Sequence, residues 1–317
     1  MQISNTLGKR VSTLVAVLGL AVSSPALAQD HSSAAPARDD IKTTLGFVPG
    51  FFKVMSDVAV GGAWQEMKGL QLNPNTALSG KTKELIGLAV AAQVPCRYCI
   101  YAHTEFAKLN GATPAELAEA VALAGVERHW SAYVYGTGLD QTRFKADLDR
   151  IVAGAKTAKP PATPIPVVDA ASARKDIEQT FGFMPEFLRR VPDSALPGAW
   201  TELETLKLSS NTQLSAKHKA LISLAVASQV PSEACVLSET AFAKLAGASE
   251  REIQEAVGMA AITRNMSTML NGQQIDEKAF NADIDRLVSG VKAAQAKAAA
   301  KTPAAAKTPA ATKTSSN

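Results

Sequence analysis

The sequence predicts an all-α protein made of two tandem helical domains that together form a pseudo-dimer. The first observation is an internal repeat, in which each matched position of the second copy lies 136 residues after its counterpart, without insertion from about residue 40 to 154. The second is that apolar residues recur at helical spacing, while no run alternates long enough with period two to predict a sheet. The matched pairs include Asp40/Asp176, Phe47/Phe183, Pro49/Pro185, Trp64/Trp200, Asn75/Asn211, Ser79/Ser215 and Phe106/Phe242.

Changes in composition divide the chain into five segments. These are a signal peptide at 1–28, a first domain at 38–155, a Pro-rich linker at 156–172, a second domain at 173–291 and a disordered tail at 292–317.

The first 28 residues have the three parts of a secretory signal peptide. Lys9 and Arg10 precede the apolar run 11–22, and Pro25-Ala26-Leu27-Ala28 follows as an A-x-A-like cleavage site. An uncleaved membrane anchor is the alternative, but the apolar run is short for a membrane span. We therefore expect an exported protein of bacterial type, periplasmic or secreted.

The basic character of the chain lies at its two ends. The tail is rich in Ala, Lys, Pro and Thr, and we expect it to be disordered because it offers no apolar face and contains repeated prolines. Removing its five lysines and the two signal-peptide charges from the formal net charge of +4 leaves −3. A nucleic-acid-binding fold carries a clustered basic surface, so no nucleic-acid partner is expected.

Helix-start signals occur at matching places in both copies. Ser79 and Ser215 are N-cap residues for helices predicted at 80–94 and 216–230, and Thr113 and Ser249 begin capping boxes. The capping boxes precede helices predicted at 114–135 and 250–270. The segment 80–94 is apolar almost all round, which predicts a central or subunit-facing helix and makes homo-oligomerisation plausible. Trp64 and Trp200 stand at matched positions, which favours core packing over catalysis.

The most informative motif is a Cys-x-x-Cys pair followed by a histidine. Pro95 should end one helix and open the next, which places Cys96 near a helix N-terminus, where the helix dipole favours thiolate. Cys96, Cys99 and His103 then share one helix face, and Glu84 lies on the preceding apolar helix. Burying a carboxylate in such a helix costs free energy, so we expect it to have a partner or a functional role. The four residues together predict a redox dithiol site.

Simpler interpretations of the same residues stay open. The cysteines could form a structural disulfide, although a loop of four residues stabilises a fold little. Cys96, Cys99, His103 and Glu84 could together bind zinc, although a second Cys pair is missing. His103 could be an ordinary surface histidine, and Glu84 could only pair with Lys81 or Lys83.

The pattern Glu84-x11-Cys96-x-x-Cys99-x3-His103, before Phe106-Ala107-Lys108-Leu109-Asn110-Gly111, resembles the carboxymuconolactone decarboxylase superfamily. More narrowly, it resembles the alkylhydroperoxidase D-like branch in a tandem form, and the resemblance covers nearly the whole chain between signal and tail. It implies an all-α fold, oligomers, and thiol-dependent peroxide reduction without a bound cofactor or metal.

The resemblance also implies roles for the motif residues. Cys99 would attack the hydroperoxide, Cys96 would resolve the sulfenic acid to a disulfide, and Glu84 with His103 would relay protons. The helix-start argument alone favours Cys96 as the attacking thiol, whereas His103 one turn from Cys99 favours Cys99. Tyr98 stands where the branch has a histidine between the cysteines; a phenol is a poor base near neutral pH, so the relay would be shorter or slower.

The second copy lacks most of the motif. Ala220, Ser232 and Glu239 replace Glu84, Cys96 and His103, and only Cys99 has a cysteine counterpart, Cys235. We expect Cys235 to be a buried small residue, with a lone reactive thiol as the alternative. The second domain should therefore complete the pseudo-dimer without a disulfide cycle.

These observations predict a peroxidase that reduces a small hydroperoxide by cycling the Cys96–Cys99 dithiol. An external thiol reductant would be its second partner. The alternatives are a lactone decarboxylase, which needs no thiol pair, and a non-catalytic exported scaffold with a structural disulfide.

Overall fold

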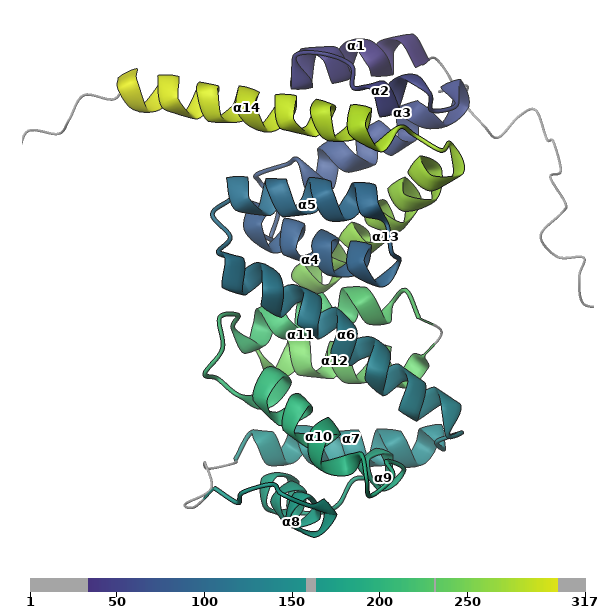
Figure 1. The fold of residues 1–317 in the computed structure, drawn as a ribbon, viewed down its shortest axis with the longest axis vertical. Helices are drawn as coiled ribbons and strands as arrows, with labels where there is room; N and C mark the ends of the chain where they lie inside the picture. The colour runs from purple at the N-terminus through teal and green to yellow at the C-terminus, as the bar shows by residue number, and fades with distance from the viewer. Residues whose placement is uncertain (1–33, 158–163, 231, 302–317) are drawn as a thin grey trace, which may run out of the picture.

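The computed structural model describes residues 34–157, 164–230 and 232–301, and within these ranges every regular element is a helix (Figure 1). The prediction of an all-α fold is confirmed. The predicted signal peptide and the end of the predicted tail lie outside the described residues. The first repeat contains α1 (Ala34–Leu45), α2 (Gly50–Lys53), α3 (Asp57–Glu66), η1 (Met67–Gln71), α4 (Gly80–Gln93), α5 (Arg97–Leu109), α6 (Pro114–Gly136) and α7 (Gln141–Ala155). The second repeat contains α8 (Ala170–Phe181), α9 (Glu186–Arg189), α10 (Leu196–Glu202), η2 (Leu203–Leu208), α11 (Ala216–Ala227), α12 (Glu233–Leu245), α13 (Glu250–Gly272) and α14 (Glu277–Lys301).

The predicted helix caps are confirmed in both repeats. The hydroxyl of Ser79 accepts a hydrogen bond from the backbone N–H of Thr82, and Ser215 caps α11 in the same way. Thr113 and Ser249 each form a complete capping box with the glutamate three residues later. Because these bonds satisfy backbone donors at the helix ends, the sequence fixes where the helices begin. The helix predicted at 216–230 ends earlier, at Ala227.

Helices α4 and α11 form the centre of the molecule and pack on each other (Figure 1). Nearly all of α4 from Thr82 to Ala91 is buried, as is α11 from Lys219 to Ala227. An apolar helix without a polar face must be covered on all sides, which explains the central position that the sequence predicts.

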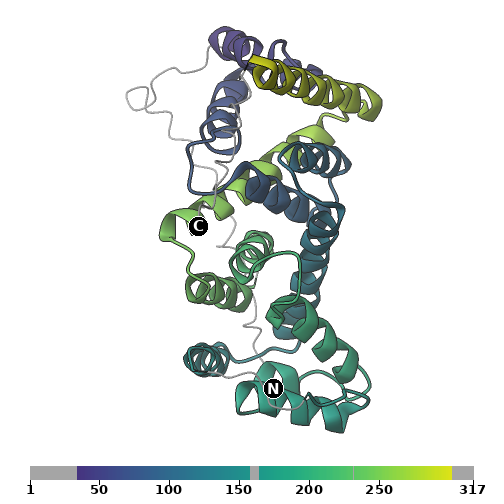
Figure 2. The same ribbon diagram turned by 90° about the vertical axis from the view of Figure 1, so that its left-hand side faces the viewer.

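The two repeats exchange their last two helices. Helix α13 packs on α4, α5 and η1 of the first repeat, and α14 packs on α5 and α2. In return, α6 packs on α11 and α12 of the second repeat as well as on α4 of its own, and α7 packs on α12 and α9. Figures 1 and 2 both show α14 beside the N-terminal helices at one end and α7 to α10 at the other. The pseudo-dimer is therefore interlocked, and each sequence repeat contributes helices to both ends.

Matched glutamates hold the exchanged helices in place. Glu255 of α13 accepts hydrogen bonds from the backbone N–H groups of Ala77 and Leu78, at 2.8 and 2.7 Å. Its counterpart Glu119 on α6 accepts from Gln213 and Leu214 of the second repeat in the same way. A charge-assisted bond to backbone N–H groups is among the stronger hydrogen bonds in proteins, so each exchange is tied at a defined point.

Paired tryptophans fill the core, as the repeat predicts. The indole N–H of Trp64 donates to Asp40 at 2.6 Å, and that of Trp200 donates to Asp176 at 2.7 Å. Both rings are buried. Each Trp–Asp pair connects the first helix of its repeat to the helix that precedes the π-helix, which is η1 in the first repeat and η2 in the second.

The predicted start of the disordered tail at residue 292 is wrong. Helix α14 continues to Lys301. The reason is that Ala, Gln and Lys are good helix formers and that no proline occurs between Glu277 and Pro303. Among the described residues, none of the helices has the length and apolar character to cross a membrane.

Candidate active site

The two cysteines lie at the start of α5, as Pro95 predicts. Cys96 is the N-cap residue of α5, and its Sγ accepts a hydrogen bond from the backbone N–H of Cys99 at 3.2 Å. The two sulfurs form a disulfide, with the Cα atoms 5.3 Å apart. Both residues are buried, at 0% exposure for Cys96 and 3% for Cys99.

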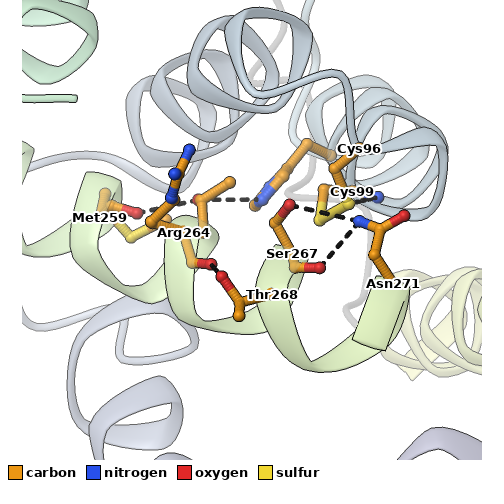
Figure 3. Close-up of a disulfide and its surroundings, with 9 residues drawn as sticks. Cys96, Cys99, Met259, Arg264, Ser267, Thr268 and Asn271 are labelled. Atoms are coloured by element: carbon orange, nitrogen blue, oxygen red, sulfur yellow. Dashed lines mark hydrogen bonds between the residues drawn. A yellow bond between two sulfur atoms is a disulfide. The ribbon is translucent and has the colours of Figure 1, made fainter. Parts of the chain in front are cut away.

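The disulfide faces a helix of the other repeat. Figure 3 shows Cys96 and Cys99 opposite Ser267 and Asn271 of α13. The amide of Asn271 donates to the backbone oxygen of Ser267 at 2.8 Å, so this polar pair is held within α13. The exchange of α13 thus supplies one wall beside the redox pair.

His103 and Glu84 form a buried pair next to the cysteines. Nδ1 of His103 lies 2.7 Å from Oε2 of Glu84, and the exposure of the two residues is 6% and 4%. Nε2 of His103 lies 3.3 Å from the hydroxyl of Thr263, which in turn donates to the backbone oxygen of Met259 at 2.8 Å. His103 is thus not a surface histidine, and its two ring nitrogens contact groups from both repeats.

Glu84 is not explained by the neighbouring lysines. Lys81 pairs with Glu116 at 2.7 Å. The ammonium of Lys83 donates to the backbone oxygens of Leu70 and Asn73 and also to Thr76. Burial lowers the pKa of Lys83 from its usual value. Lys83 therefore anchors the loop after η1, and Glu84 is left to pair with His103.

Two further residues belong to the site, and the motif did not predict either of them. The amide of Gln71, at the end of η1, donates to Oε1 of Glu84 at 3.1 Å. Gly87 on α4 lies against the His103 ring, where an added Cβ would be only 2.6 Å from Nε2. The only signal for Gln71 in the sequence is that its counterpart in the second repeat, Lys207, is charged, as is the residue that replaces His103.

Tyr98, the remaining residue predicted for the site, makes its hydrogen bond elsewhere. Its hydroxyl donates to the backbone oxygen of Ile275 at 2.5 Å, and its ring packs edge-on against Phe280. Residue 98 follows Cys96 by two positions in the first turn of α5, so its side chain leaves the face that carries the cysteines. Tyr98 instead joins α5 to the turn between α13 and α14.

A cavity of about 1010 Å³ opens onto the site. Cys99, His103, Glu84 and Gln71 line it, whereas Cys96 is not among its lining residues. Much of the remaining wall is apolar and comes from Phe51, Phe106, Leu109, Met266, Leu270 and Phe280. Within the described ranges, no group of three or more His, Cys, Asp and Glu residues is arranged to hold a metal ion.

Comparison with known proteins places this arrangement in a family. The model of the carboxymuconolactone decarboxylase family matches residues 59–139 and 195–277, which together make up about half of the chain. The chain belongs to the carboxymuconolactone decarboxylase family. The two matches run from α3 to α6 and from α10 to the end of α13, so each includes only the first helix of its exchanged pair.

Two relatives can be compared with this family member. A protein from Paracoccus denitrificans described as "Uncharacterized protein 4 in cox locus" is 39% identical over 59 residues. That match covers 19% of this chain and 53% of the relative, so the chain spans about half of the relative's length. A solved structure of a putative gamma-carboxymuconolactone decarboxylase subunit from Burkholderia xenovorans is 18% identical, with a TM-score of 0.48. The structural match covers 83% of this chain and 98% of the solved chain.

The second family repeat holds a single thiol that is not set up for a disulfide. Cys235 is free and buried, and Ser232 stands at the position of Cys96, donating to the sulfur at 3.1 Å. Burial, together with the nearby Glu127 carboxylate, raises the pKa of Cys235 to about 12. The interpretation of Cys235 as a buried small residue is confirmed.

Proposed function

We propose that this family member is a thiol-dependent hydroperoxide reductase that cycles the Cys96–Cys99 dithiol. The supporting observation is that Cys99 and the buried Glu84–His103 pair line one cavity, with Cys96 directly behind Cys99. A purely structural disulfide would not explain why a buried carboxylate–imidazole pair lies beside the same cavity.

Access favours Cys99 as the attacking thiol. In the reduced protein, the thiolate of Cys99 attacks the terminal oxygen of the hydroperoxide, and the O–O bond breaks. The sulfur is oxidised to sulfenic acid while the leaving alkoxide takes up a proton and departs as an alcohol. Cys96 does not line the cavity, so its position suits the resolving role better than the attacking one.

The hydrogen bonds of His103 favour Nε2 as the atom that transfers protons in this proposal. Nδ1 is committed to Glu84, which fixes the ring and stabilises the imidazolium when it forms. The hydroxyl hydrogen of Thr263 goes to Met259, so the hydroxyl oxygen is free to accept from Nε2. With the ring hydrogen on Nδ1, Nε2 is unprotonated and can take the proton of Cys99; it then donates to the Thr263 hydroxyl until it gives the proton to the leaving alkoxide.

Two further steps close the cycle. The thiol of Cys96 attacks the sulfur of the Cys99 sulfenic acid, which forms the disulfide and releases water. An external dithiol then reduces the disulfide by thiol–disulfide exchange and is itself oxidised. The N-terminus of α5 stabilises a thiolate on Cys96, so Cys96 is the better leaving group in that exchange.

The cavity suits an organic hydroperoxide better than hydrogen peroxide alone. Its volume of about 1010 Å³ is at the upper end of the range for small-molecule sites. Its apolar wall would bury a hydrocarbon substituent, while Cys99 and His103 in the same lining would meet the peroxide group. We further propose, from the predicted signal peptide, that the protein works outside the cytoplasm.

The test is the consumption of cumene hydroperoxide by the mature protein, with dithiothreitol as reductant. Cys99→Ser is the blank, and Cys235→Ser is the matched control because it removes a buried thiol from the other repeat. We expect turnover that Cys99→Ser abolishes and Cys235→Ser retains. Turnover equal in the wild type and the Cys99→Ser blank would rule out the proposal. Lactone decarboxylation that survives replacement of both Cys96 and Cys99 would instead favour the decarboxylase.

A further inference from the structure

Helices of both repeats enclose a second cavity, around α11 and α12, at the place equivalent to the first site. It has a volume of about 750 Å³ and lies among α6, α7, α11, α12 and η2. Its apolar wall is rich in aromatic rings and includes Trp130, Phe144, Phe187 and Phe242. This second site thus lacks the redox residues of the first site but has a cavity of similar position.

Three buried charged groups replace the polar groups of the first site. Glu239, Lys207 and Glu127 stand 136 residues from His103, Gln71 and Thr263, so all three positions of the network are occupied by different chemistry. The ammonium of Lys207 lies 2.5 Å from Oε1 of Glu239 and 3.1 Å from Oε2 of Glu127. All three residues line the second cavity.

One carboxylate oxygen of this triad has no partner. Oε2 of Glu239 makes no hydrogen bond, although the residue is only 4% exposed. Burying a carboxylate oxygen that has no hydrogen-bond donor costs free energy, and transferring an ionised carboxylate from water to the interior costs more. The triad has two carboxylates for one ammonium, so one negative charge stays uncompensated when both are ionised.

The surrounding charged groups do not compensate it. Lys219 on α11 donates to the backbone oxygens of Leu206 and Ser209. Asp147 on α7 accepts from the backbone N–H of Glu186, and Cys235 on α12 stays a neutral thiol. Burial raises the pKa of Glu239, Lys207 lowers it and the Glu127 carboxylate raises it, and together they bring the pKa to about 7. In the empty cavity, a proton thus neutralises the surplus charge near neutral pH.

We propose that this second cavity binds a small organic cation, with the Glu239 carboxylate turning toward an ammonium group and an apolar or aromatic body against the ring-lined wall. A monocation brings the triad to neutrality and supplies the donor that Oε2 lacks. The aromatic faces of the wall add favourable contact with a cation or an aromatic substituent. Neither a neutral alcohol nor an anion supplies the missing positive charge.

The cation and the proton compete for the same carboxylate, which gives the proposal a measurable signature. Binding of a cation requires ionised Glu239, so affinity rises with pH through the Glu239 pKa of about 7, and binding below that pKa releases about one proton. Calorimetry of the unmodified protein in two buffers of different ionisation enthalpy measures that proton directly.

The probes are 2-phenylethylammonium, 2-phenylethanol and phenylacetate, which share one ring and chain and differ in charge. We expect the ammonium to bind at one site per chain, at least ~tenfold more tightly than the alcohol. Phenylacetate should not bind there. Glu239→Gln keeps the shape and should remove the preference for the cation, whereas Cys99→Ser in the first site should leave it intact.

Three results would overturn the proposal. One is equal affinity for the ammonium and the alcohol in the wild type, and another is ammonium binding without pH dependence or proton release. The third is loss of binding in Cys99→Ser, which would move the ligand to the first cavity. If Glu239→Gln does not fold, the pH dependence and proton release of the unmodified protein still decide the question.

Discussion

At the residue scale, Gly87 determines whether the His103 ring can reach Glu84. A Cβ at this position would overlap the ring, so the ring would have to leave its place beside Glu84. Gly87 therefore acts as a positioning residue on α4, although it has no chemistry of its own.

We predict that Gly87→Ala lowers kcat/KM for the hydroperoxide by about 10²-fold, the lower end of what general acid–base catalysis contributes. Overpacking should also cost about 1–3 kcal/mol of stability. Steady-state kinetics and denaturant unfolding measure the two effects. Gly125→Ala on α6 is the control, because nothing lies within 4 Å of its added Cβ. It should leave kcat/KM unchanged, and wild-type kinetics in Gly87→Ala would show that the His103 position is not critical.

The three thiols of the reduced protein should differ in reactivity. Because the pKa of Cys235 is raised to about 12, its thiolate fraction near neutral pH is on the order of a thousandfold below that of an ordinary thiol. We predict that iodoacetamide modifies Cys99 and spares Cys235 until the protein is unfolded. Peptide mass spectrometry at increasing pH checks this. Alkylation of native Cys235 at the rate of Cys99 would contradict it.

At the element scale, α5 is held between its own repeat and the exchanged helices of the other. Tyr98 and Tyr101 extend from α5 to the region of α14, where their hydroxyls donate to Ile275 and Asp285. The start of α5, which carries the cysteines, is thus fixed by contacts 177 and 184 residues away in the chain.

We predict that Tyr98→Phe lowers the free energy of unfolding by about 1 kcal/mol, because the carbonyl of Ile275 loses its donor. Its kcat/KM should stay within about twofold of the wild type, a difference well below 1 kcal/mol. Urea unfolding and steady-state kinetics measure these quantities. Tyr101→Phe is the matched control, and its more exposed bond to Asp285 should contribute less stability. A large loss of turnover in Tyr98→Phe would return the phenol to the proton relay.

At the scale of the whole molecule, the two repeats share a core. A single cluster of buried apolar residues contains Ile86 and Val90 of α4 together with Leu221 of α11 and Met259 of α13. Helix exchange and this shared core make the halves mutually dependent, while the pseudo-symmetry leaves two equivalent cavities with different chemistry.

We predict that cutting the chain within 158–163 leaves the protein assembled and active. The exchanged helices and the shared core do not depend on that connection. A protease site introduced there, followed by cleavage and size-exclusion chromatography in native buffer, tests this. The fragments should co-elute with turnover within about twofold of the uncut protein, and should separate in urea. Native separation of the fragments would contradict an interlocked fold.

The local features of this protein follow from its sequence. The cap residues Ser79, Thr113, Ser215 and Ser249 set helix starts because each acts within three residues of itself. The repeat and the Cys-x-x-Cys motif with His103 and Glu84 predict the fold class, the family and the central pair of the site. The cap and motif predictions needed only spacing along one or two helices, whereas the fold class rested on the repeat and the family on the resemblance of the motif.

Only the tertiary structure decided which repeat completes each site. Thr263 reaches His103 across 160 positions, and Glu127 reaches Lys207 across 80, because α13 and α6 cross to the opposite half. Such contacts depend on how buried helix faces pack, which local spacing does not encode. The same limit explains Tyr98: its neighbours in sequence are the cysteines, but its hydroxyl is committed to a turn of the other repeat.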